Sequence, residues 1–152
     1  HLVIVGRHTE YTDKIERFIK ENKLEERVHI ISNVPFDDLP AFYQLAEIFV
    51  YPSRFEGFGI PIIEALYSDI PVVAATGSCL EEAGGPDSIY VHPDDIKGMA
   101  NAFKQIYSDT ERKKEMIEKG QKFAKRFSEE KQAEEILNIY KKLMKWTYLN
   151  IQ

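Results

Sequence analysis

YPSRFEGFGIPIIEAL, residues 51–66, is the stretch that says most about the fold of this chain. Two glutamates, Glu56 and Glu64, stand eight positions apart in it. Glu64 is the only charged residue among positions 57–67. Because a carboxylate on a buried element is costly unless something binds it or hydrogen-bonds to it, this stretch predicts a ligand.

A helix is predicted to begin near Ile60, because Pro61 lacks a backbone N–H group and favours the first helical turn. Before it, Gly57 and Gly59 allow a tight turn and leave no side chain between the backbone and a ligand. The N–H groups of Phe58, Gly59 and Ile60 would then be free donors at the positive end of the helix dipole. Such a helix start suits phosphate oxygens.

The two carboxylates would repel a phosphate group. We therefore expect Glu56 and Glu64 to accept hydrogen bonds from neutral hydroxyl groups, as the acidic residue of dinucleotide sites does with ribose. Donors for a diphosphate, with acceptors for hydroxyls on either side, describe a site for a nucleotide-sugar. Three simpler interpretations stay open: a capping box of Ser53 and Glu56, a helix-dipole role for Glu64, and glycines that serve only a strand-to-helix turn.

Strands and helices are predicted to alternate along the chain. The expected strands are short, rich in Val and Ile and apolar on both faces, and they cover residues 2–5, 28–31, 48–51, 72–75 and 89–91. The expected helices cover residues 12–22, 38–45, 60–67, 96–107, 111–125 and 129–148, with a short turn near Leu80. This alternation predicts the α/β class, with a doubly wound, Rossmann-like parallel sheet and helices on both faces. Ligands bind such sheets at the carboxyl ends of the strands, and residues 51–66 lie at such an end.

Length and composition limit the classes of function. The 152 residues make one domain-sized unit, and a formal net charge of −5 argues against nucleic acid as a partner. No apolar run is long enough to span a bilayer, and the start resembles no signal peptide. Cys79 is the only cysteine, which suits the reducing cytoplasm, and it is also a candidate nucleophile. Because His1 leads directly into an expected strand, we expect a piece of a longer protein.

The residues around the two glutamates resemble a known family. The pattern is PSxxEGFGIPxxEA from Pro52 to Ala65, followed by IPVVA from Ile70 to Ala74. It is similar to the signature of the retaining glycosyltransferases of family 4, also called glycosyl transferases group 1. In that family it belongs to the C-terminal, donor-binding domain of the two-domain GT-B fold. The flanking text AEIFVYP, residues 46–52, and GSCLEEAG, residues 77–84, extends the resemblance over nearly the whole chain.

The resemblance implies a role for each matching position. Glu56 would contact hydroxyls of the donor sugar near the reacting centre, and Glu64 would bind the ribose hydroxyls. The diphosphate cradle would be formed by the backbone of Gly57, Phe58, Gly59 and Ile60. The nucleotide base would meet the main chain at Val34, Pro35 and Phe36, a place that the residues alone do not suggest.

The implied reaction is transfer of a glycosyl group from a UDP- or GDP-sugar to an acceptor hydroxyl, with retention at the anomeric carbon, in glycan or glycolipid biosynthesis. N–H groups at the helix start would stabilise the negative charge that grows on the departing diphosphate. We favour a positioning and electrostatic role for Glu56, with a nucleophilic role as the alternative. No cofactor and no metal ion are expected, since the four histidines show no ligand spacing.

Two features of the family have no counterpart in these residues: an earlier strand whose loop carries basic residues to the diphosphate, and the acceptor domain. We therefore expect residues 1–152 to form a single nucleotide-sugar-binding domain that is inactive by itself. The parent protein would bind a glycan or lipid-linked acceptor through an N-terminal domain. Peripheral contact of the parent with the inner face of the membrane is compatible with this expectation. The alternative is a non-catalytic nucleotide- or sugar-binding module.

The closing helix is expected to be capped by Ser128, with Glu129 and Glu130 in its first turn. Its apolar stripe consists of Ile136, Leu137, Tyr140, Leu143 and Met144. Trp146, Tyr148 and Leu149 continue beyond what a core would need. The sequence leaves open whether this helix packs on the core or exposes its apolar side.

Overall fold

The structure is a computed structural model that describes residues 1–149 of the chain, with side chains described up to Met144. These residues divide into two compact units, His1–Phe42 and a second unit that begins at Tyr43. That residues 1–152 act as one domain stays a prediction.

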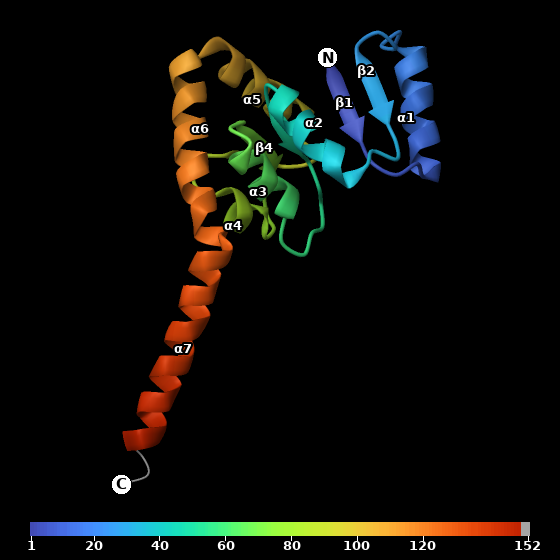
Figure 1. The fold of residues 1–152 in the computed structure, drawn as a ribbon. Helices are drawn as coiled ribbons and strands as arrows, with labels where there is room; N and C mark the ends of the chain where they lie inside the picture. Colours follow the sequence, from blue (N-terminus) through green and yellow to red (C-terminus); the bar gives the residue numbers. More distant parts are fainter. Residues whose placement is uncertain (150–152) are drawn as a thin grey trace. The chain divides into compact units, whose positions relative to one another are not determined.

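The first unit is a parallel βαβ arrangement (Figure 1). Strand β1 (Leu2–Val5) leads into helix α1 (Glu10–Glu21), which returns to strand β2 (Val28–Ile31). Leu2 pairs with Val28, and the register continues to the ends of both strands. Thr9 caps α1 in a capping box, in which the Thr9 side chain accepts from the Thr12 backbone N–H group and the Thr9 backbone N–H group donates to the Thr12 hydroxyl at 2.9 Å. A 3₁₀ turn, η1 (Phe36–Asp38), and the start of helix α2 (Leu39–Leu45) close the unit.

The second unit is built on a three-stranded parallel sheet in the order β3-β4-β5. Figure 1 labels its strand β4 and several of the helices around it. Its elements after α2 are β3 (Phe49–Tyr51), α3 (Ile60–Tyr67), β4 (Val72–Ala75), α4 (Leu80–Gly84), β5 (Ile89–Val91), α5 (Ile96–Ser108), α6 (Thr110–Ala124), η2 (Lys125–Phe127) and α7 (Glu129–Leu149).

Strand β4 is the centre of the hydrophobic core, and all four of its residues are buried. Val72 and Ala74 pack in one cluster with side chains of α3 and α4. Val73, between them, packs in a second cluster with Ala102 and Ile106 of α5. Since successive strand residues point to opposite faces, helices cover both faces of this sheet. The predicted parallel α/β arrangement is confirmed.

The predicted elements match the structure closely. Strands 2–5, 28–31, 72–75 and 89–91 and helix 60–67 have the predicted bounds. The strand expected at 48–51 begins at Phe49, and the helix expected at 38–45 follows a 3₁₀ turn and begins at Leu39. Pro40 accounts for the second difference, because proline favours the first turn of a helix. The described strands lie in a two-stranded and a three-stranded sheet.

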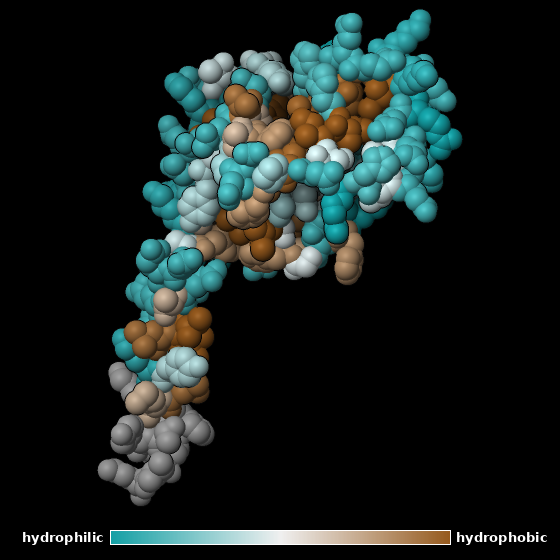
Figure 2. All heavy atoms as spheres, turned by 45° about the vertical axis from the view of Figure 1, so that its right-hand side comes forward, coloured by the Kyte–Doolittle hydropathy of each residue, from teal (hydrophilic) through white to brown (hydrophobic). Residues whose placement is uncertain are grey.

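Helix α7 begins as predicted, since the Lys131 N–H group donates to the Ser128 hydroxyl at 3.3 Å. Its apolar stripe is exposed: Ile136, Leu137, Tyr140, Leu143 and Met144 are each more than half accessible. Figure 2 shows apolar side chains gathered along this helix. The side chains of Trp146, Tyr148 and Leu149 lie outside the described part of the chain. No helix among the described residues is long and apolar enough to cross a membrane.

Two methionines offer a matched test of this core. Met116 on α6 is 2% exposed, whereas Met144 on α7 is 59% exposed. Met116→Ala should lower the free energy of unfolding by about 2–5 kcal/mol, because it leaves a cavity beside Val73. Met144→Ala should change it by less than about 0.5 kcal/mol. Urea unfolding followed by circular dichroism measures both values, and equal losses would contradict the assigned core.

Candidate functional site

The stretch that joins β3 to α3 lies at the carboxyl end of a strand of the second unit, as predicted. Helix α3 begins at Ile60, with Pro61 in its first turn. Glu56 lies in the loop and Glu64 in the helix, and both are half-buried. The predicted cradle, Gly57, Phe58, Gly59 and Ile60, is therefore the end of the loop and the first residue of the helix.

Gly59 is required for two separate reasons. It caps α3 with a φ of 105°, in the left-handed region that favours glycine. A Cβ atom at this position would also lie 2.8 Å from Leu80 Cδ2 and 3.3 Å from Ala83 Cβ, both on α4. Gly57 differs, because an added Cβ there meets no heavy atom within 4 Å. The space beside Gly57 is open to a ligand.

Each glutamate accepts a hydrogen bond from a tyrosine that sequence reasoning missed. The Tyr43 phenol donates to Glu64 Oε2 at 2.8 Å, and the Tyr51 phenol donates to Glu56 Oε1 at 2.8 Å. Burial and the adjacent carboxylate raise the pKa of Tyr51 to about 12. Burial, with the hydrogen bond to Glu64, also raises the pKa of Tyr43. Both phenols therefore keep their protons and act as donors.

A row of aromatic rings holds these phenols. The centroids of Tyr43 and Phe49 lie 5.4 Å apart, and those of Phe49 and Tyr51 lie 5.8 Å apart. Phe49 and Tyr51 are two positions apart on β3, so their side chains share one face of the strand. Tyr51 closes the strand five residues before Glu56, a position that could have indicated the contact. Tyr43 is 21 residues from Glu64, and no sequence spacing points to it.

Two of the simpler interpretations are wrong. Ser53 and Glu56 form no capping box, because no helix starts there and the Ser53 hydroxyl donates instead to the Phe55 carbonyl at 3.3 Å. Glu64 does not complement the helix dipole in the first turn, since the first turn of α3 contains no acidic residue. The third interpretation accounts for Gly59, which the turn and the packing against α4 require, but Gly57 has no steric need to be glycine.

Loops that follow β4 and β5 contact the same segment. The Cys79 thiol donates to the Glu56 carbonyl oxygen at 3.2 Å, and Arg54 pairs with Asp94 through a bond of 3.1 Å from its Nη1. Beside Cys79, Glu81 accepts hydrogen bonds from the Thr76 hydroxyl and the Gly77 N–H group, which lower the pKa of Glu81. The loops after all three strands thus meet at one edge of the sheet.

The predicted base-binding residues belong to the first unit. Val34, Pro35 and Phe36 follow β2 and lead into η1, and Phe36 is 77% exposed. Their role stays a prediction, as do the roles of the loop residues.

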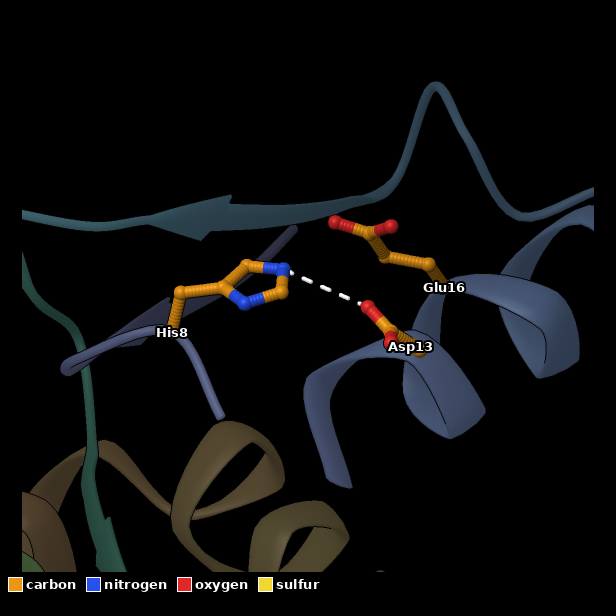
Figure 3. Close-up of side chains that lie close together, drawn as sticks. All are labelled: His8, Asp13 and Glu16. Atoms are coloured by element: carbon orange, nitrogen blue, oxygen red, sulfur yellow. Dashed lines mark ion pairs between the residues drawn. The ribbon is translucent and has the colours of Figure 1, made fainter. Parts of the chain in front are cut away.

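One group of side chains in the first unit could hold a metal ion, judged over the described residues (Figure 3). His8 precedes α1, and Asp13 and Glu16 lie one turn apart on that helix, with ligand atoms within 4.8 Å of one another. His8 Nε2 lies 3.4 Å from Asp13 Oδ1. All three side chains are exposed. Spacing along the sequence did not suggest this group, because His8 lies outside the helix.

Comparison with known proteins identifies the family of this chain. The family model described as "Glycosyl transferases group 1" matches residues 1–123. The O-antigen chain mannosyltransferase B of Escherichia coli is 31% identical over 142 residues, which are 93% of this chain and 37% of that protein. The chain thus spans little more than a third of the length of that relative.

Two solved structures share the fold. The Anabaena Alr3699/HepE protein, in complex with UDP, matches 92% of this chain and 40% of its own with a TM-score of 0.83 and 22% identity. The C-terminal domain of a glycosyl transferase group 1 family protein (LpcC) from Francisella tularensis matches 82% of this chain and 68% of its own, with a TM-score of 0.73 and 23% identity. Because the family model covers most of its length, this chain belongs to the glycosyl transferases group 1.

Proposed function

We propose that this chain binds the nucleotide-sugar donor, a UDP- or GDP-sugar, for a parent enzyme that transfers the sugar with retention to an acceptor hydroxyl. One observation carries the proposal. A single segment between β3 and α3 presents a helix start with open space beside Gly57, and it carries a phenol-bonded carboxylate on either side of that start.

The helix start is the part suited to the diphosphate. The Ile60 N–H group, at the first residue of α3, has no acceptor within the helix. With the N–H groups of Phe58 and Gly59 it lies near the positive end of the helix dipole, whereas Pro61 has no N–H group and the Ile62 N–H group donates to the Gly59 carbonyl. Negative charge grows on the diphosphate as the glycosidic bond to it breaks. Fixed N–H donors stabilise that charge without reorganising, so the residues from Gly57 to Ile60 assist departure of the leaving group.

The two glutamates are suited to hydroxyl groups. Each is half-buried and already accepts one hydrogen bond from a phenol, and an ionised carboxylate offers about four acceptor sites in all. We assign Glu56 to the transferred sugar and Glu64 to the ribose. Glu56 then positions the sugar and stabilises positive charge near the anomeric carbon, and nucleophilic attack by Glu56 is the alternative.

The comparisons support the donor class. The E. coli relative is named as a mannosyltransferase, and the Anabaena neighbour was solved with UDP. We propose that the acceptor, a glycan or a lipid-linked glycan, is bound by another part of the parent, and that donor binding needs no metal ion. The main chain at Val34, Pro35 and Phe36 is proposed to meet the base.

A non-catalytic nucleotide- or sugar-binding module would use the same segment. Its loop geometry and its carboxylates would serve binding alone. Incubation of the full-length parent with UDP- and GDP-sugars separates the two, because an enzyme releases nucleoside diphosphate by transfer or hydrolysis and a binding module does not.

Replacing the glutamates tests the assignment of the two ends of the donor. Glu64→Ala in the full-length parent should weaken binding of the nucleoside diphosphate and of its sugar conjugate alike. Glu56→Ala should weaken only the conjugate. Each loss should be about 10- to 100-fold, since a hydrogen bond to a charged group contributes about 1.5–3 kcal/mol. Isothermal titration calorimetry with UDP, GDP, UDP-glucose and GDP-mannose measures these affinities. An equal loss for both ligands in the Glu56 variant would refute the division.

A methyl group at Gly57 tests the diphosphate cradle. Gly57→Ala should leave the free energy of unfolding within about 1 kcal/mol of the wild type, because the added Cβ meets open space. It should nevertheless weaken nucleoside diphosphate binding about tenfold or more by blocking close approach. Gly6→Ala is the matched control, since its Cβ also meets no atom within 4 Å. Unchanged affinity in Gly57→Ala would remove this segment from the phosphate site.

A further inference from the structure

The two tyrosine–glutamate hydrogen bonds share one geometry. In each, a half-buried phenol outside the loop donates to one oxygen of a signature glutamate at 2.8 Å. The phenols come from α2 and from the end of β3, both next to the site. Both lie within the second unit. Such pairing at both carboxylates indicates that the phenols orient the glutamate side chains.

We infer that Tyr43 and Tyr51 are positioning residues of the donor site, with Tyr43 acting through Glu64 and Tyr51 acting through Glu56. This inference rests on the proposed function, because it assigns the two phenols to the two ends of the bound donor. Tyr43 then strengthens binding of the nucleoside, and Tyr51 strengthens binding of the transferred sugar.

A glutamate needs such a partner because its carboxylate is carried on several rotatable bonds. A half-exposed glutamate loses rotamer freedom when a ligand fixes it, and that loss weakens binding. A phenol that fixes the carboxylate beforehand removes much of this loss. The phenols are themselves restrained, since the Tyr43, Phe49 and Tyr51 rings form one row of contacts.

The direction of the hydrogen bonds also matters for selectivity. Each phenol keeps its proton and donates it, so the carboxylate remains an acceptor for everything else that it contacts. Since each phenol engages a single carboxylate oxygen, most of the acceptor sites of Glu56 and Glu64 are left for a ligand. The pairs therefore favour neutral hydroxyl groups, as on ribose and hexose, at both ends of the donor.

A third phenol in the same unit provides a matched control. Tyr90 on β5 is also half-buried, and it donates to a backbone carbonyl, that of Gly85, at 2.7 Å. Burial raises its pKa to about 12, as for Tyr51. Tyr90→Phe therefore removes a phenol hydrogen bond of similar burial that has no glutamate carboxylate of the site as its partner.

The test measures donor binding by the full-length parent carrying Tyr43→Phe, Tyr51→Phe or Tyr90→Phe. Calorimetry with UDP, UDP-glucose, GDP and GDP-mannose gives the affinities. Tyr43→Phe should weaken the nucleoside diphosphate and its sugar conjugate equally, by about 3- to 10-fold. Tyr51→Phe should weaken only the conjugate, by a similar factor. Tyr90→Phe should leave both affinities unchanged, while urea unfolding reports the structural cost of all three variants.

Double variants show whether each phenol acts through its glutamate. In the Glu64→Ala background, Tyr43→Phe should cause no further loss of affinity, and the same should hold for Tyr51→Phe in the Glu56→Ala background. Additive losses, or losses in Tyr90→Phe equal to those in the other two variants, would overturn the positioning role while leaving donor binding intact. Failure of the wild-type parent to bind any of the four ligands would instead overturn the proposed function, and with it this inference.

Discussion

Burial of β4 on both faces is the constraint from which the rest of the second unit follows. None of its four residues is more than 1% exposed, and their side chains pack in two separate hydrophobic clusters. Helices must therefore cover both faces, and parallel strands joined by helices bring every strand's carboxyl end to one edge. The loops of Glu56, Cys79 and Asp94 meet at that edge for this reason. The position of the candidate site therefore follows from the covering of both sheet faces by helices.

Much of this arrangement could be predicted because local signals agree with the tertiary structure. Val72 to Ala75 is an unbroken apolar run that only a covered strand accommodates. Pro61 indicates from the sequence alone that α3 starts next to it. The Glu56 and Glu64 pair stood out because charge is rare on such an apolar stretch. Where propensity, periodicity and turn chemistry coincide, the sequence alone is sufficient.

What escaped prediction are contacts between residues far apart in the chain. Tyr43 reads as an ordinary member of a short helix, and nothing near it reveals that its phenol reaches Glu64. The Cys79 bond to the Glu56 carbonyl joins positions 23 apart, and it depends on how two loops fold over the sheet edge. The exposure of the apolar side of α7 could not be predicted for a related reason. Amphipathic periodicity indicates which side of a helix is apolar, but it does not indicate what packs against that side.

The left-handed glycine at the start of α3 has a consequence for how this segment can change. At Gly59 the backbone angle and the packing against α4 each disfavour a side chain independently. Trimming Leu80 would relieve the close contact but not the φ of 105°, and loosening the loop would relieve the angle but not the contact. A replacement at position 59 therefore meets two separate costs, one in the backbone angle and one in the packing against α4. Position 59 is thus constrained by the fold itself, whereas position 57, two residues earlier, has no steric requirement for glycine.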